Sequence, residues 1–120
     1  MKSKLIRIIS QAFYGNMVET EVCVEDIDRF ILGYIDSNIT ITKMIDRTII
    51  NIPDVKKLVI IYNKYEEKYA KDEGMRVLAK IPEMNIELHS RCIACRINEN
   101  GEFESVESED IPIIGKYFLS

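Results

Sequence analysis

Apolar and polar residues repeat along this chain with two different periods, and each period predicts a different element. Residues 5–9 are mostly β-branched and predict a buried strand. From Thr20 to residue 35 the spacing becomes helical, and Thr20 is placed to cap that helix. The apolar stripe of the predicted helix falls at i, i+3, i+4, i+7 and i+8, and it consists of Ile27, Phe30, Ile31, Tyr34 and Ile35.

The period of a strand returns after this helix. In residues 39–42 isoleucine alternates with threonine, which predicts a strand with one buried face. Residues 48–52 are again rich in isoleucine and continue the predicted sheet. After a turn, residues 58–62 form the longest apolar run of the chain. Because this run does not alternate, it predicts a central strand that is buried on both faces.

The second half of the chain repeats the change between helix and strand. Residues 65–81 predict a second helix, either continuous or broken at Gly74. Alternation in residues 86–94 predicts another strand, and the Asn-Glu-Asn-Gly sequence at 98–101 is a strong hairpin signal. A final helix is predicted from about residue 108 onward, since apolar residues again recur at helical spacing there.

These elements predict an α+β fold with the order β-α-β-β-α-β-β-α. The β-α-β-β-α-β part of this order is typical of a ferredoxin-like sandwich, in which helices cover one face of an antiparallel-rich sheet. The chain has 120 residues, enough for one core, and it contains no repeat, low-complexity tract or linker. We therefore expect residues 1–120 to form a single domain.

Composition restricts the compartment. Apolar residues make up 47% and charged residues 30% of the chain, which is an ordinary globular balance. The longest apolar run is far shorter than the roughly 20 residues of a membrane span, and the basic start lacks the features of a signal peptide. Three cysteines, an odd number, favour free thiols in a reducing compartment. The prediction is a cytoplasmic protein without membrane segments.

Charge is distributed unevenly along the chain. The formal net charge is −4, which gives no general attraction for nucleic acid, so nucleic acid is not expected as a partner. Residues 56–80 carry 7 basic and 4 acidic side chains, whereas residues 81–120 carry 3 basic and 8 acidic ones. An asymmetry of this kind can orient self-association or a charged ligand, and it is also typical of a solvated face.

The strongest candidate for metal chemistry is a Cys-x-x-Cys pair, Cys92 and Cys95. The only histidine, His89, lies just before it, and Cys23 could complete a set of four zinc ligands. The predicted strand argues against this site, because residues three apart in a strand point to opposite faces. We therefore predict free cysteines and no metal, with zinc as the alternative.

No catalytic set emerges from the remaining motifs. His89 and Glu87 would lie on one face of the predicted strand and could form an acid–base pair. A single histidine at a strand surface is more often structural, however. The glycines are isolated, and no phosphate-binding loop pattern is present. The sequence therefore predicts a protein that is not an enzyme and needs no cofactor.

Basic and aromatic residues are interleaved around the middle of the chain, a combination that can bind phosphates and stack bases. Guanidinium groups on the following strand could add fixed hydrogen bonds to a phosphate. The predicted contacts for a nucleotide or another small anionic metabolite are Tyr62, Lys64, Tyr65, Arg91 and Arg96.

The first half of the chain resembles short sporulation-associated proteins of low-GC bacteria. The likeness rests on the hydrophobic pattern of a strand, an amphipathic helix and a strand ending in Leu-Val-Ile-Ile-Tyr (residues 58–62), and it assigns no site residue. The richness in isoleucine, lysine and asparagine is typical of AT-rich bacterial or phage genomes. Our leading hypothesis is a regulatory protein that acts by binding a protein partner and forms homo-oligomers through exposed sheet edges. The alternative is a binding protein for a small anionic ligand.

Overall fold

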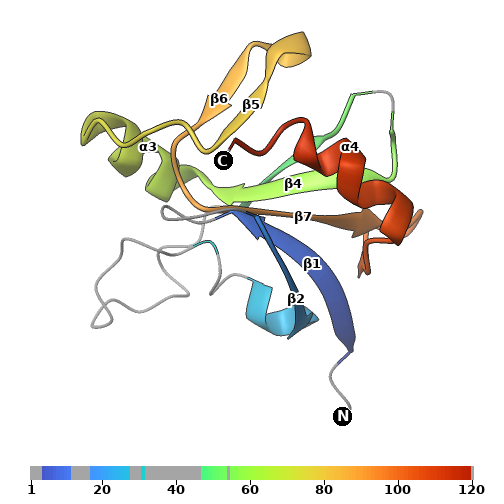
Figure 1. Cartoon of the computed structure of the whole chain (residues 1–120). Coiled ribbons are helices and arrows are strands. Elements are labelled where there is room, and N and C mark those ends of the chain that lie inside the picture. The colour runs from blue at the N-terminus through green and yellow to red at the C-terminus, as the bar shows by residue number, and fades with distance from the viewer. Residues whose placement is uncertain (1–3, 12–16, 28–30, 32–46, 54, 120) are drawn as a thin grey trace.

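The computed structural model describes residues 4–11, 17–27, 31, 47–53 and 55–119 of the chain (Figure 1). Its main element is a six-stranded sheet with the order β2-β1-β7-β4-β3, to which β8 is added beside β7. Each strand pair in this sheet is antiparallel. The strands are β1 (Leu5–Gln11), β2 (Val18–Cys23), β3 (Arg47–Asn51), β4 (Leu58–Asn63), β7 (Cys92–Ile97) and β8 (Phe103–Glu104).

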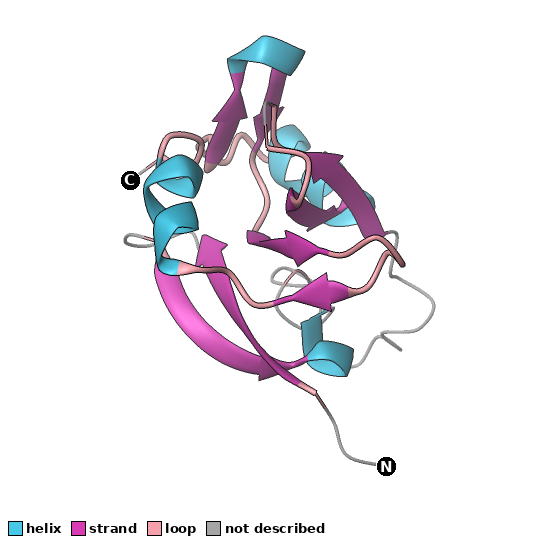
Figure 2. Ribbon diagram, turned by 90° about the vertical axis from the view of Figure 1, so that its right-hand side faces the viewer, coloured by secondary structure: helices cyan, strands magenta, loops and turns pink. Residues whose placement is uncertain are grey.

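Smaller elements surround this sheet. A second, two-stranded sheet, β5 (Ala79–Ile81) and β6 (Ile86–Leu88), projects from the body of the molecule (Figures 1 and 2). Two α-helices are described, α3 (Lys64–Asp72) and α4 (Ile111–Gly115). Short 3-10 turns occupy Val24–Asp26, Pro82–Met84 and Ser108–Asp110. None of the helices in the described ranges is long and apolar enough to cross a membrane.

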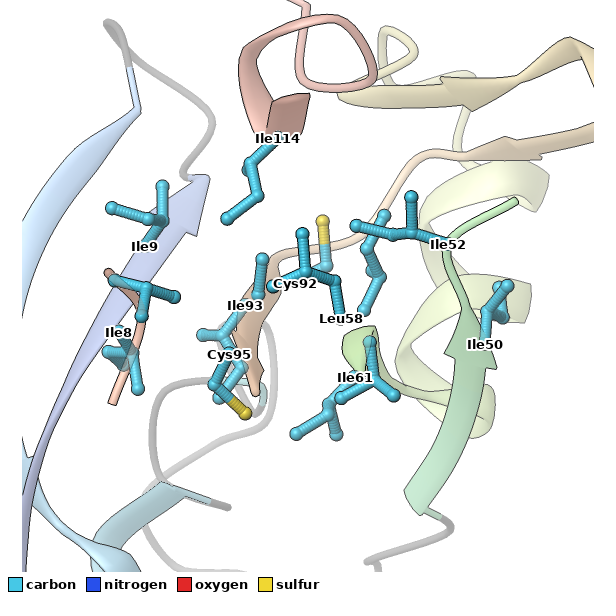
Figure 3. Close-up of a cluster of buried hydrophobic side chains, with 14 of the residues drawn as sticks. Ile8, Ile9, Ile50, Ile52, Leu58, Ile61, Cys92, Ile93, Cys95 and Ile114 are labelled. Atoms are coloured by element: carbon cyan, nitrogen blue, oxygen red, sulfur yellow. The ribbon is translucent and has the colours of Figure 1, made fainter. Parts of the chain in front are cut away.

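The core lies on both faces of β4 and β7. Four successive residues at the start of each of these strands are buried. The run without alternation in residues 58–62 predicted this for β4, whereas the alternation predicted for residues 86–94 is not found in β7. Cys92 and Cys95 belong to opposite faces of β7 and both lie in this cluster, while Ile114 of α4 and Ile9 of β1 belong to the same core (Figure 3). Each fully buried isoleucine side chain stabilises the fold by roughly 1.5–3 kcal/mol relative to an exposed one.

The sequence leaves two lengths open for the second helix, and the structure selects the shorter. Asn63 is buried and caps α3, because its side-chain oxygen accepts a hydrogen bond of 2.9 Å from the backbone N–H of Glu66. Gly74 then adopts a left-handed conformation with φ of 71°, which ends the helical segment. The prediction of helix as far as residue 81 is wrong, since Ala79–Ile81 forms β5.

The predicted element order is also wrong at the start of the second element. Residues 18–23, where we expected the helix capped by Thr20 to begin, form β2 and pair with β1 over six residue pairs. Ile27 and Ile31, two members of the predicted apolar stripe, are fully buried. Val24–Asp26 within that predicted helix forms a 3-10 turn. Residues 28–30 and 32–35, and the strand predicted at 39–42, lie outside the described residues.

The α+β class and the mainly antiparallel sheet are confirmed. The described elements follow the order β-β-β-β-α-β-β-β-β-α, so these residues do not show a ferredoxin-like sandwich. The hairpin at 98–101 is confirmed. Asn98 Oδ1 accepts hydrogen bonds from the backbone N–H groups of Asn100 and Glu102, both at 2.9 Å, and Gly101 has φ of 81°. The final helix is confirmed as well, as a 3-10 turn that continues into α4.

Candidate functional site

The five residues predicted to bind an anionic ligand divide between the two ends of the sheet. Tyr62 lies near the carboxyl end of β4, and Lys64 and Tyr65 follow in the first turn of α3. Arg91 directly precedes β7, which runs antiparallel to β4, so it belongs to the same end. Arg96 is five residues further along, at the opposite end of β7 and about 16 Å away at strand spacing. One small ligand therefore does not contact all five residues.

Arg96 is held in an ion-pair cluster with the turn that precedes α4. Its Nε donates to Asp110 Oδ2 at 2.6 Å, and its Nη2 donates to Asp110 Oδ1 at 2.9 Å, so the two side chains form a bidentate pair. The backbone N–H of Glu107 adds a third hydrogen bond to the Asp110 carboxylate at 2.7 Å. Glu107 and Glu109 approach the same guanidinium at 3.7 and 3.5 Å. The positive charge of Arg96 is thus already compensated within the chain.

The buried Asp110 carboxylate stays ionised because of this cluster. Burial by itself raises the pKa of Asp110. The hydrogen bonds from Arg96 and from the Glu107 backbone, together with the charge of Arg96, lower this pKa by more than burial raises it, so the net shift is downward. The hydrogen bond to Asp110 in turn raises the pKa of Arg96 above its usual range. These opposed shifts indicate a pair that stabilises the fold and connects α4 to β7.

A surface cavity of about 420 Å³ lies beside this cluster, at the β7–β8 hairpin. Its charged lining contains two cations, Lys57 and Arg96, and three carboxylates, those of Glu99, Glu104 and Glu107. Because Asp110 already neutralises Arg96, the lining repels rather than attracts an anion. The cavity therefore gives no support to the predicted nucleotide or anionic metabolite.

His89 forms the second organised polar group, with a partner that the sequence pattern did not indicate. Glu67 of α3 accepts three hydrogen bonds: from the backbone N–H groups of His89 and Ser90, at 2.6 and 2.9 Å, and at 2.9 Å from His89 Nδ1. Both side chains of the Glu67–His89 pair are about 15% exposed. We call this group the Glu67 clamp, since it fixes α3 against the connection between β6 and β7.

The acid–base pair considered for Glu87 and His89 is not formed. Glu87 lies 3.7 Å from the ammonium group of Lys80 across the β5–β6 ribbon. The expected strand position of His89 is wrong too, because β6 ends at Leu88 and β7 begins only at Cys92. A carboxylate on His89 Nδ1 is an arrangement that catalytic histidines use. The three hydrogen bonds that Glu67 accepts nevertheless all join α3 to the β6–β7 connection, which is a structural role.

The cysteines are positioned as core residues. Burial, reinforced by the Glu67 carboxylate, raises the pKa of Cys92 far above its usual range. Burial also raises the pKa of Cys95 to about 12, although the charge of Arg47 acts in the opposite direction. Thiols with such pKa values are poor nucleophiles and poor metal ligands at neutral pH. Cys23 is half-buried in β2. Across the described ranges, no three His, Cys, Asp or Glu side chains are grouped so as to hold a metal ion.

Among the residues that the structure describes, the outermost strands of the sheet are β2 and β3, and they differ in chemistry. Among the described residues no strand pairs with the outer edge of β3. The backbone N–H of Ile52 donates to Leu58 O at 2.9 Å, directed toward β4. Since inward and outward hydrogen-bonding groups alternate along an antiparallel strand, the N–H and C=O of Ile49 point outward, at the open edge. The Ile49 side chain is 40% exposed, so the edge is also apolar.

The other edge is protected by charge. β2 carries Glu19 and Glu21 on one face, and Glu19 forms an ion pair of 2.9 Å with Arg7 of β1. If two β2 strands paired about a two-fold axis at Thr20, Glu19 of each copy would face Glu21 of the other. Directly opposed like charges destabilise a strand pair. Charged side chains along an edge strand commonly protect it against unwanted pairing. β3 lacks this protection over most of its length, because its one charged residue, Arg47, lies at its end.

Sequence reasoning predicted the strand at 48–52 but not its position at the edge. The signal that could have pointed to it is the composition of the segment, in which four successive residues after Arg47 are uncharged and three of them are β-branched. No protein family, curated protein or solved structure matches this chain. The functional argument therefore rests on the chemistry of its own residues.

Proposed function

We propose that this chain is a non-enzymatic interaction protein that self-associates by pairing the β3 edges of two copies. The observation that carries the proposal is the apolar outer edge of β3, with the backbone groups of Ile49 directed outward. An exposed strand edge is a ready template for another strand. A two-fold axis is the commonest way in which identical chains satisfy such an edge.

The sequence of β3 is compatible with its own two-fold pairing. With the axis at Ile49, the two Ile49 residues exchange main-chain hydrogen bonds and their side chains meet across the pair. Thr48 then faces Ile50 of the second copy, which is a favourable β-branched pair. Arg47 faces the neutral Asn51, so no like charges are opposed. The six-stranded sheet would continue across the axis into a second sheet of the same kind.

The expected association is reversible. A strand of five residues covers less surface than the roughly 1,200 Å² at the lower end of stable interfaces. We therefore expect a dimer with a micromolar dissociation constant, whose subunits exchange between dimers. A dimer of this strength would be controlled by the local concentration of the chain, which suits a regulatory role by binding.

The polar groups described above support a binding protein over an enzyme. The Arg96–Asp110 pair joins β7 to the start of α4, and the Glu67 clamp joins α3 to the β6–β7 connection. The buried thiols of Cys92 and Cys95 have pKa values too high for nucleophilic work. The chemistry that the described residues organise therefore maintains the fold, and the open edge is what they present to a partner.

Sedimentation equilibrium over a wide concentration range tests the proposal. Replacing Ile49→Lys opposes two ammonium groups across the two-fold axis, and we expect the dimer dissociation constant to rise at least about tenfold. The matched control is Val18→Lys on the other edge strand, where the side chain is 52% exposed. This change should leave the dissociation constant unaltered. A monomeric wild type at high micromolar concentration, or equal effects of both substitutions, would refute the proposal.

A further inference from the structure

α3 and the hairpin between β7 and β8 lie at opposite ends of the sheet (Figure 1). α3 follows the carboxyl end of β4, whereas the hairpin after β7 lies at the other end because β4 and β7 are antiparallel. The six residues of β4 separate these ends by about 20 Å. Exposed lysines outnumber exposed carboxylates on α3, and exposed glutamates predominate at the hairpin, beside which Lys57 lies.

The outer face of α3 carries three lysines and two tyrosines, with the exposed carboxylate of Asp72 at its carboxyl end. Lys64, Lys68 and Lys71 are exposed and fall at i, i+4 and i+7, so they form one stripe along the helix. Tyr65 and Tyr69 form the adjacent stripe and are 51% and 46% exposed. Within the described ranges, none of the three lysines takes part in an ion pair. We call these five residues the Lys–Tyr face.

The opposite end of the sheet presents an acidic hairpin. Glu99 and Glu102 are exposed in the turn between β7 and β8, and Glu104 follows in β8. Glu102 accepts one hydrogen bond of 3.3 Å from the Asn98 side chain, which holds the turn in place. The hairpin is well ordered by the Asn98 hydrogen bonds, so its carboxylates are presented on a rigid support. We call these three glutamates the acidic hairpin.

We infer that the Lys–Tyr face of one copy binds the acidic hairpin of a second copy, in a head-to-tail contact separate from the β3 edge. The two surfaces match in charge and number, with three lysines against three glutamates. The Tyr65 hydroxyl group is a donor for a carboxylate, and the tyrosine rings cover apolar area at a small entropy cost. Each copy carries both surfaces, so the Lys–Tyr face of any copy can bind the acidic hairpin of any other copy.

The charge of the whole chain favours this occupant over a nucleic acid. The net charge of −4 repels a long polyanion, whereas a rigid hairpin with three carboxylates places negative charge only where the helix is basic. Exposed ion pairs contribute only about 0.2–1 kcal/mol each, so the contact is weak and strongly dependent on salt. Complementary charge also steers the two ends together and increases the association rate.

A head-to-tail contact has a consequence for the size of the assembly. It is heterologous, because different surfaces meet, and such contacts form open chains unless the rotation closes a ring. The β3 edge is by contrast closed by its two-fold axis. The two contacts together would connect dimers into longer assemblies at low ionic strength, and salt would return them to dimers as it screens the charges.

Sedimentation velocity in the Ile49→Lys background isolates the head-to-tail contact from edge pairing. At low ionic strength we expect species larger than monomers, and at high ionic strength monomers. Lys64→Gln/Lys68→Gln removes the basic surface, and Glu99→Gln/Glu102→Gln removes the acidic one. Each variant alone should be monomeric. An equimolar mixture should form a dimer that grows no further, because each variant keeps only one of the two surfaces.

The control Lys4→Gln/Lys116→Gln changes the net charge by the same amount as Lys64→Gln/Lys68→Gln, at two exposed lysines away from α3. At each ionic strength, the association constant of this control should differ from that of the Ile49→Lys background by less than about twofold. Failure of the equimolar mixture to associate would overturn the inference, and so would association that is insensitive to salt. Single-stranded DNA that binds to the Lys–Tyr face in place of the second copy would overturn it too. None of these outcomes affects the β3 proposal, which the wild-type dimer tests separately.

Discussion

At the scale of single residues, the chain uses its most organised charges internally. Asp110 is only 1% exposed, and a buried carboxylate without a partner would destabilise the fold strongly. The bidentate pair with Arg96 and the Glu107 backbone N–H compensate for that burial. The sequence suggested Arg96 as a contact for the phosphate of a ligand. In the structure, Arg96 is instead paired with the carboxylate of Asp110.

Replacing Asp110→Asn should lower the free energy of unfolding at neutral pH by about 2–4 kcal/mol, since it leaves Arg96 without its charged partner. The folded-state pKa of Asp110 is lowered below its ordinary value of 3.8. Its contribution is therefore complete above that value and lost as pH falls through the folded pKa. Urea unfolding at several pH values measures this.

The difference in stability between wild type and Asp110→Asn should shrink in acid. The control is Glu109→Gln, an exposed carboxylate at 3.5 Å from the same guanidinium, which should leave the free energy of unfolding nearly unchanged. A constant difference between wild type and Asp110→Asn from neutral pH to pH values below 3.8 would contradict the role assigned to the pair.

At the scale of elements, the Glu67 clamp determines how α3 sits against the sheet. The helix has nine residues, of which only Glu66 and Ala70 are buried. A helix this short is marginal by itself, so its stability depends on tertiary contacts. The Asn63 cap and the clamp together supply four hydrogen bonds to or from its first turn.

Glu67→Ala should destabilise the protein by about 2–4 kcal/mol, because it removes three hydrogen bonds to a charged acceptor and leaves two backbone donors without it. We expect the amides of α3 to exchange with solvent faster than those of β4 in this variant. Hydrogen-exchange mass spectrometry measures both. Asp72→Ala, at an exposed position of the same helix outside the Lys–Tyr face, is the matched control and should leave the exchange of α3 nearly unchanged. Uniform loss of protection over the whole chain would argue against a local clamp.

At the scale of the whole molecule, the two outermost strands of the described sheet differ, since β2 is charged and β3 is apolar. The side chains of β4 and β7 are buried on both faces of the sheet and belong to one core (Figure 3). We therefore expect edge pairing to add to the stability of a chain that folds by itself.

Thermal stability should depend on protein concentration if the edges pair. Any partner that binds the folded state stabilises it by mass action, by roughly 2.7 kcal/mol at one hundred times the dissociation constant. The Tm of the wild type should rise with concentration, and that of Ile49→Lys should not, in differential scanning calorimetry. Val18→Lys should behave as the wild type does. A concentration-independent wild-type Tm over the micromolar range would contradict self-association.

The sequence by itself determined the elements whose signals are local. The apolar run at 58–62 has no polar face, so burial on both sides was its only stable position. The Asn-Glu-Asn-Gly hairpin followed from turn chemistry, in which the side chain of Asn98 bonds the backbone and Gly101 accepts a positive φ. The isoleucine-rich strand at 48–52 and the helix that begins after Asn63 likewise follow from residues within a few positions of one another.

The tertiary structure decided what depends on partners distant in sequence. Residues 18–23 have helical periodicity with the residues that follow, but six pairings with β1 make them a strand. His89 is bound by Glu67, 22 residues away, and Arg96 by Asp110, 14 residues away, and no periodicity encodes either pair. The edge position of β3 depends on the order of all the strands. Hydrogen bonds and ion pairs form between side chains that are close in space, whatever their distance along the chain. The sequence pattern therefore indicated residues such as His89 and Arg96, but it did not indicate their partners.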